Sequence, residues 1–142
     1  MDVGLRPITQ SDYEFLWRLH NAALQQYVEQ TWGWDEEWQA DDFRKKFDPA
    51  VGNIITVDGV DAGFWWISER KNEIVLVSIR LLPEFQRRGI GTRLILGLTD
   101  NSQLPIRLKV LKVNPARRLY ERLGFSVTED LDTHFEMTYR PK

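Results

Sequence analysis

The chain has 142 residues, of which 42% are hydrophobic and 28% charged, and its formal net charge is -2 at pH 7. This size and composition are typical of one globular domain, so we expect a single domain over residues 1–142. The small net charge gives no reason to expect nucleic-acid or anionic-membrane partners. Without cysteine, disulfides, thiolate metal ligands and a covalent cysteine intermediate are excluded. No stretch resembles a membrane span or a signal peptide, so we expect a cytoplasmic protein.

The first thirty residues predict a strand followed by a helix. Val3 and Leu5 alternate with polar neighbours, as in a half-buried strand. Ser11 and Glu14 have the spacing of a capping box, which predicts that a helix begins there. Apolar residues then recur at helical spacing as far as Tyr27.

A second helix is predicted after the break at Trp32-Gly33-Trp34. Asp35 is suited to cap it, and two glutamates follow in the first turn, where they complement the helix dipole. Its apolar side is expected to carry Trp38, Phe43 and Phe47.

From residue 53 the pattern changes to strands. Residues 54–57 and 60–67 flank Asp58-Gly59, which is a strong hairpin signal. Residues 73–82 read as a long, mostly buried strand that ends before Pro83.

The last third alternates helices and strands. We expect a helix at 89–98, a strand at 106–110, a short helix opened by Asn114-Pro115, and strands at 125–127 and 134–139. The predicted order is β-α-α-β-β-β-α-β-α-β-β, an α/β arrangement with a mixed sheet and helices on both faces.

A basic, glycine-containing turn leads into the predicted helix at 89–98. It reads Gln86-Arg87-Arg88-Gly89-Ile90-Gly91-Thr92. Helix N-termini present unpaired N–H groups and partial positive charge, which suit a phosphate group. The glycines allow the backbone to approach a pyrophosphate closely. The alternative is a plain strand-to-helix turn, and the segment is not a P-loop because the Gly-Lys-Ser/Thr ending is missing.

A second motif makes a family resemblance specific. Residues 86–91 match the Gln/Arg-x-x-Gly-x-Gly/Ala acetyl-CoA loop of the GNAT superfamily of N-acyltransferases. Residues 114–125 resemble that family's other hallmark, Asn-x-x-Ala/Arg-x-x-Leu-Tyr-x-x-x-Gly-Phe, with one residue fewer between Asn114 and Leu119. One helix and one strand separate the two motifs, as in the family. The resemblance implies a GNAT-like fold with a mostly antiparallel sheet of about seven strands.

The resemblance also implies acetyl-CoA as the acyl donor and assigns its contacts. The pyrophosphate would be held by Gln86, Arg87, Arg88, Gly89, Ile90, Gly91 and Thr92. The end of the preceding strand would pair with pantetheine and face the thioester oxygen through Arg80, Leu81 and Leu82. Asn114 would contact the pantetheine arm, and Arg117 would lie near the phosphates.

The catalytic residues are less completely specified. Tyr120 is the candidate general acid for the thiolate leaving group, and the alternative is a tyrosine that only packs in the core. Many family members carry a glutamate base on the fourth strand, where this chain has Val75. Glu73 lies two residues earlier and is a candidate base acting through water. It is equally a solvated residue at a strand start.

The acceptor site of the family usually forms between the first two helices. Here that segment is rich in tryptophan and acidic residues, which would attract a cationic amine, although both features also suit a plain helix start. The candidate acceptor residues are Tyr27, Trp32, Trp34 and Glu36. His134 at the last strand is a further candidate, or a surface residue. His20 is given no role.

The leading hypothesis is therefore an acetyl-CoA-dependent N-acetyltransferase acting on a small-molecule primary amine, with a small cationic amine favoured. The alternatives are a non-catalytic acetyl-CoA sensor with the same fold and a protein N-terminal or lysine acetyltransferase. A nucleic-acid-binding domain is disfavoured by the net charge. No residue cluster has metal-ligand spacing, so we expect no metal. A homodimer is common in the family.

Overall fold

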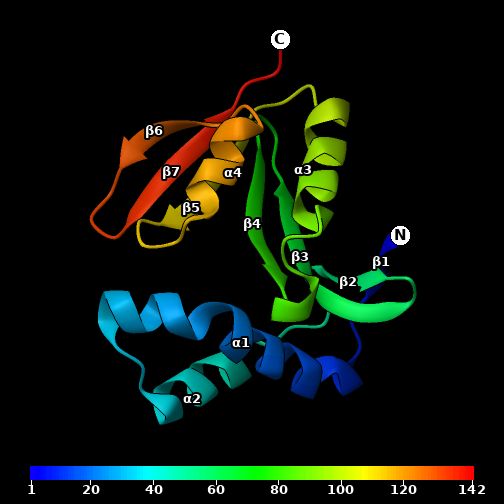
Figure 1. Cartoon of the computed structure of the whole chain (residues 1–142), viewed down its shortest axis with the longest axis vertical. Helices are drawn as coiled ribbons and strands as arrows, with labels where there is room; N and C mark the ends of the chain where they lie inside the picture. The colour runs from blue at the N-terminus through cyan, green and yellow to red at the C-terminus, as the bar shows by residue number, and fades with distance from the viewer. The chain divides into compact units, whose positions relative to one another are not determined.

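The computed structural model describes residues 1–142, and its strands form a seven-stranded sheet in the order β1-β2-β3-β4-β5-β7-β6 (Figure 1). The strands are β1 (Val3–Pro7), β2 (Asn53–Val57), β3 (Val60–Glu69), β4 (Ile74–Leu81), β5 (Ile106–Leu111), β6 (Ser126–Asp130) and β7 (His134–Tyr139). The helices are α1 (Tyr13–Trp32), α2 (Glu36–Lys46), α3 (Ile90–Asn101) and α4 (Ala116–Arg122), with 3-10 turns η1 (Gln10–Asp12) and η2 (Pro83–Phe85). The predicted element order and the mixed, mostly antiparallel sheet are confirmed.

The chain divides into two compact units, which we describe separately. Unit 1 comprises Met1–Trp66 and Ser78–Gln86, and unit 2 comprises Ile67–Val77 and Arg87–Lys142. The expectation of one domain stays a prediction. None of the helices combines the length and apolarity needed to cross a membrane.

The sheet of unit 1 is built on a tight hairpin. β2 pairs with β1 and β3, both antiparallel. Asp58 and Gly59, which connect β2 to β3, have φ values of 50° and 80°. Positive φ at both central residues is the backbone that a two-residue hairpin requires, so the turn predicted from Asp58-Gly59 is confirmed.

The start of α1 differs from the prediction. The capping box is formed by Thr9 and Asp12, whose carboxylate accepts a hydrogen bond from the Thr9 backbone N–H at 2.8 Å. The chain enters η1 at Gln10 and continues into α1 at Tyr13. The Ser11–Glu14 box is therefore wrong, because Asp12 is drawn inward to pair with Arg6 at 2.8 Å. At its other end, α1 stops at Gly33 as predicted.

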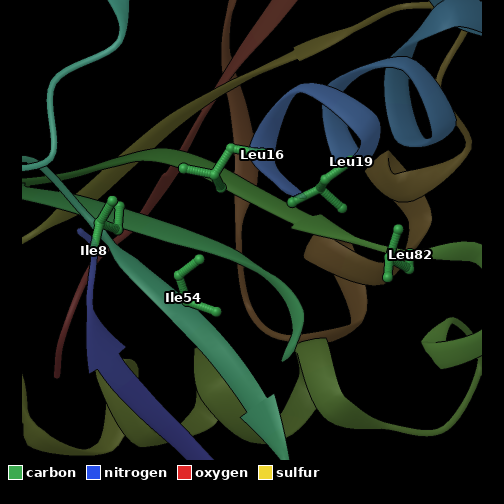
Figure 2. Close-up of a cluster of buried hydrophobic side chains, with 5 residues drawn as sticks. All are labelled: Ile8, Leu16, Leu19, Ile54 and Leu82. Carbon is green, nitrogen blue, oxygen red and sulfur yellow. The ribbon is translucent and has the colours of Figure 1, made fainter. Parts of the chain in front are cut away.

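The core of unit 1 forms where α1 covers the sheet. Figure 2 shows its buried cluster, formed by Ile8, Leu16, Leu19, Ile54 and Leu82. α2 lies beside α1 (Figure 1), and Phe43 and Phe47 both meet the ring of Tyr13 edge-on. Asp35 caps α2 as predicted, by accepting from the Trp38 N–H at 3.1 Å. The Trp38 side chain, expected on the buried side, is 59% exposed.

Unit 2 contains the second part of the sheet and helices α3 and α4. β7 is antiparallel to both β5 and β6. β4 is parallel to β5, and the two strands pair only at Ile74–Ile106 and Val75–Arg107. Predicted boundaries shift by one residue for β4 and by up to three for α3 and β6, which runs to Asp130 instead of Val127. Such ends depend on pairing partners that a local pattern does not specify.

Candidate active site

The turn before α3 has the backbone of an anion site. Arg87 and Gly89 both have positive φ, 62° and 77°. Gly89 is the N-cap of α3, and its carbonyl accepts the Arg93 N–H at 3.0 Å. The amides of Ile90, Gly91 and Thr92 precede the first intrahelical donor and so have no acceptor within the helix. A Cβ built on Gly89 would meet nothing within 4 Å, which leaves room for a ligand beside the backbone.

At the end of β4, the backbone N–H groups on one side are hydrogen-bonded to β3, and those on the other side point away from it. The Leu82 N–H donates to the Ala62 carbonyl at 2.9 Å. This amide is therefore not available to pantetheine, contrary to the prediction. Because N–H directions alternate along a strand, the Leu81 N–H points away from β3. The Leu81 carbonyl accepts a hydrogen bond from the Gln86 side chain at 3.0 Å. Of the predicted strand amides, Leu81 is the one whose direction suits a ligand.

The helix α4 carries the candidate acid. The helix begins at Ala116 with Pro115 as its N-cap, one residue later than Asn114-Pro115 predicts, and the Asn114 side chain accepts from the Ala116 N–H at 2.9 Å. Tyr120 is 8% exposed, and its ring packs 6.0 Å from that of Phe125. Burial raises the pKa of the Tyr120 phenol to about 12, so the hydroxyl keeps its proton at neutral pH. Its catalytic role stays a prediction.

Arg117 is engaged by its own helix and by β7. Its Nε donates to the Glu121 carboxylate at 2.6 Å, and its guanidinium lies 4.4 Å from the centre of the Phe135 ring. The guanidinium therefore has partners within the protein and does not need a phosphate to hold it in place. The predicted position near the coenzyme stays a prediction.

Glu73 lies just before β4, in an ion-pair network. Arg107 donates to both Glu73 oxygens, at 2.8 and 3.2 Å, and to Glu136 at 3.1 Å. The hydrogen bond from Arg107 holds the pKa of Glu73 below its ordinary value. These three side chains line a hollow of about 350 Å³ together with Arg140. A carboxylate held by an arginine is a weak proton acceptor, so the structure argues against Glu73 as the base.

The predicted acceptor residues are only partly brought together. The Trp34 indole N–H donates to the Glu36 carboxylate at 2.7 Å. The backbone carbonyl of Tyr27 accepts from Thr31, and Trp32 is 60% exposed. In unit 2, His134 Nδ1 shares a hydrogen bond with the Thr133 hydroxyl at 2.8 Å, and burial lowers the His134 pKa.

Sequence reasoning missed a cluster centred on His20. The His20 ring contacts aromatic side chains of α1 and α2, and its Nδ1 lies 3.3 Å from Nη1 of Arg80. The signal was present in the spacing of Trp17 and His20 on one helix and of Gln39 and Phe43 on the next. Only their packing shows that these two pairs face each other.

The residues present fit a pyrophosphate-containing coenzyme. Left-handed backbone at Gly89, open space beside it and three helix-start amides are features that an anionic phosphate uses. No group of three or more His, Cys, Asp or Glu side chains in the structure could hold a metal ion.

Comparisons with known proteins identify the fold and the family of the chain. A comparison with curated protein sequences gave no match. Among solved structures, the PaiA N-acetyltransferase from Thermoplasma acidophilum in complex with coenzyme A is 20% identical, with a TM-score of 0.78 and 99% of each chain covered. An acetyltransferase from Thermus thermophilus is 17% identical, with a TM-score of 0.75 and coverage of 100% of this chain and 98% of that one. The ribosomal-protein-S18-alanine N-acetyltransferase from Escherichia coli is 21% identical, with a TM-score of 0.65 and coverage of 97% and 93%.

These structures share the fold of the chain. The family model described as an acetyltransferase (GNAT) domain matches residues 51–127, more than half of the chain and including the turn before α3 and Tyr120. The protein belongs to the GNAT family of acetyltransferases.

Proposed function

We propose that this protein transfers an acetyl group from acetyl-CoA to a primary amine. The observation that carries the proposal is the N-terminus of α3, where Gly89 is left-handed and open to a ligand within the segment matched by the family model. When bound, the coenzyme supplies an acetyl thioester whose sulfur is a good leaving group. The roles of the protein's own residues follow from their backbone directions and charges.

The backbone provides the coenzyme contacts. The amides of Ile90, Gly91 and Thr92 bind the pyrophosphate, with Arg87 and Arg88 adding positive charge. The Leu81 N–H binds the thioester oxygen, where negative charge develops during attack. A preorganised donor of this kind is typically worth about 3 kcal/mol of barrier.

Tyr120 stabilises the leaving sulfur by donating a hydrogen bond. Its pKa of about 12 lies well above that of an ordinary thiol, about 8.5. With these two pKa values, complete proton transfer from the Tyr120 phenol to a thiolate is unfavourable. The hydrogen bond lowers the charge density on sulfur, and the final proton comes from solvent.

The proposal assigns no protein base, because Arg107 holds Glu73. Attack then uses the neutral fraction of the amine. For a lysine-type amine with a pKa of about 10.4, this fraction rises tenfold per pH unit over the neutral range.

The acceptor side of the proposal rests on aromatic and acidic groups. Glu36 accepts one hydrogen bond from Trp34, and a carboxylate has further lone pairs for an ammonium group. Tryptophan faces attract cations, which supports a small cationic amine. Tyr27, Trp32 and His134 stay predicted acceptor contacts, and the cytoplasmic location and homodimer stay predictions. Acetylation of a protein N-terminus or lysine is the second candidate, and a sensor without turnover is the third.

Calorimetric titration of acetyl-CoA tests the central claim. We expect saturable binding to the wild type and none to Gly89→Glu, because the added carboxylate repels the pyrophosphate. Gly59→Glu is the matched control: Gly59 also has positive φ and open space, but lies in the β2–β3 hairpin. It carries the same backbone strain and charge and should bind as the wild type does. Absence of wild-type binding at millimolar acetyl-CoA would overturn the proposal.

A further inference from the structure

Arg80 is a largely buried cation in unit 1 that has no carboxylate partner. Arg80 lies near the end of β4, and its backbone carbonyl lies close to Gly63 on β3. A Cβ at position 63 would be 2.1 Å from the Arg80 carbonyl oxygen, so only glycine allows this approach. The side chain has one hydrogen-bond partner, His20 Nδ1 at 3.3 Å. By contrast, Arg6, Arg44, Arg107 and Arg117 each contact at least one carboxylate.

His20 holds the Arg80 guanidinium in one orientation. Because arginine only donates, Nδ1 of His20 must be the acceptor, and Nε2 then carries the proton and donates to Gln39 Oε1 at 3.0 Å. Three rings fix the imidazole plane, with centroids 5.7, 5.9 and 5.4 Å away: those of Trp17, Trp34 and Phe43. Burial, and to a lesser extent the charge of Arg80, lower the His20 pKa and keep the ring neutral.

The guanidinium retains donors for a ligand. It has five N–H groups, and the structure uses one of them. The fully buried side-chain polar atom without a partner is Asn21 Oδ1, so solvent still reaches the remaining Arg80 nitrogens. Burial alone lowers the Arg80 pKa to about 10, which shows that the charge is held there at a cost. A buried charge that costs stability and keeps free donors is typical of a ligand contact.

We propose that Arg80 binds a carboxylate of the acceptor, so that the substrate is a small amino acid carrying both an amine and a carboxylate. The inference rests on the proposed function and narrows its substrate class. A guanidinium fork matches a carboxylate in two parallel hydrogen bonds. His20 contacts both Arg80 and the ring of Trp34, whose indole holds Glu36. A cationic group contacts this histidine and an anionic group contacts the tryptophan beside it, which suits a zwitterion better than a polyamine. His20 acts as the positioning residue of Arg80.

The test compares amines that differ only in a carboxylate. Acetylation is followed as thiol release with L-lysine against cadaverine, L-ornithine against putrescine and L-arginine against agmatine. We expect kcat/KM of the wild type to favour each carboxylate-bearing member by on the order of 100-fold. In Arg80→Met, which keeps the length of the side chain, the preference should disappear. In Arg80→Lys it should be partly retained, because the charge remains but the fork is lost.

A second readout does not depend on turnover. We expect millimolar L-lysine, but not cadaverine, to raise the Tm of the wild type in the presence of coenzyme A, and to leave Arg80→Met unchanged. The Tm of Arg80→Met itself should equal or exceed that of the wild type, because a buried cation without an acid partner has been removed.

The outcomes separate the two proposals. Equal kcat/KM for the members of each pair in the wild type would overturn the carboxylate assignment and leave the acetyltransferase intact. An equal loss for both members in Arg80→Met, with a lowered Tm, would show a purely structural arginine. If acetyl-CoA bound and no amine were acetylated, the proposed function would fail. The inference would then stand only if L-lysine still shifted the wild-type Tm.

Discussion

Two arginines in this protein are each held by two carboxylates, whereas Arg80 has a histidine as its partner. Arg6 lies 2.8 Å from both Asp12 and Asp61, and Arg107 bridges Glu73 and Glu136. Carboxylate hydrogen bonds raise the pKa of both, while burial lowers that of Arg80.

If Arg80 binds a ligand as proposed, the difference separates a structural arginine from a ligand-binding one. Arg6 ties the end of β1 to η1 and β3, segments as many as 55 residues apart. Its charge is neutralised within the fold, so it has little left to offer a ligand. Arg80 links β4 to α1 through His20, but this contact adds no negative charge to balance the guanidinium. In the role proposed above, a carboxylate of the acceptor completes its hydrogen bonds.

The largest expected effect comes from removing a structural arginine. Arg6→Met leaves Asp12, which is 7% exposed, without its cation. We expect unfolding free energy to fall by about 3 kcal/mol, or roughly 10 °C in Tm, because an unpaired buried charge is costly. Urea denaturation measures the change. Arg6→Lys should lose less unfolding free energy. If Arg6→Met were as stable as the wild type, Arg6 and Arg80 would not differ in their contribution to stability.

Low pH should break the ion pair between Arg6 and Asp12. The hydrogen bond from Arg6 lowers the pKa of Asp12 to about 2, below its ordinary value of 3.8. A depressed carboxyl pKa stabilises the native state above the ordinary value, and this contribution is lost as pH falls through the native pKa. We expect a loss of up to about 2 kcal/mol between roughly pH 4 and pH 2.

The control for this titration is Asp12→Asn. The variant lacks the titrating carboxyl but retains His20, whose lowered pKa adds its own loss of stability as pH falls below about 6.5. Subtracting the two urea-derived pH profiles isolates Asp12. Parallel profiles would show that Arg6 does not stabilise the ionised carboxyl.

The smallest effect is expected at an exposed pair. Arg117 and Glu121 are both nearly half exposed, and exposed ion pairs contribute little. Arg117→Gln should change the unfolding free energy by less than about 0.5 kcal/mol. The same variant tests the predicted phosphate contact, since calorimetry should show weaker acetyl-CoA binding only if Arg117 reaches the coenzyme.

The sequence predicted best where the signal is local. Asp58-Gly59 specified its hairpin, and Asn114-Pro115 marked a helix start to within one residue, because a turn or a helix start depends on neighbouring residues. The β7 boundaries His134–Tyr139 were also predicted correctly. The predicted coenzyme loop rests on a local signal too, since one short segment carries both its glycine backbone and its helix start.

Local patterns failed where two readings were equally good. Thr9–Asp12 and Ser11–Glu14 both have capping-box spacing, and the pairing of Asp12 with Arg6 selected the first. Trp38 has the helical spacing of a core residue, yet α2 packs through Phe43 and Phe47. Periodicity shows which residues share a side of a helix, but not which part of that side is covered.

The sequence by itself determined the order of elements, the family motifs and the glycine-containing turn before α3. Only the tertiary structure decided which charges are neutralised. Glu73 was a candidate base until Arg107, 34 residues away, was found beside it, and His20 had no role until Arg80, 60 residues away, was found at its Nδ1. The free energy of a charged side chain depends on its burial and on its partners in space, and neither is encoded in the spacing of nearby residues.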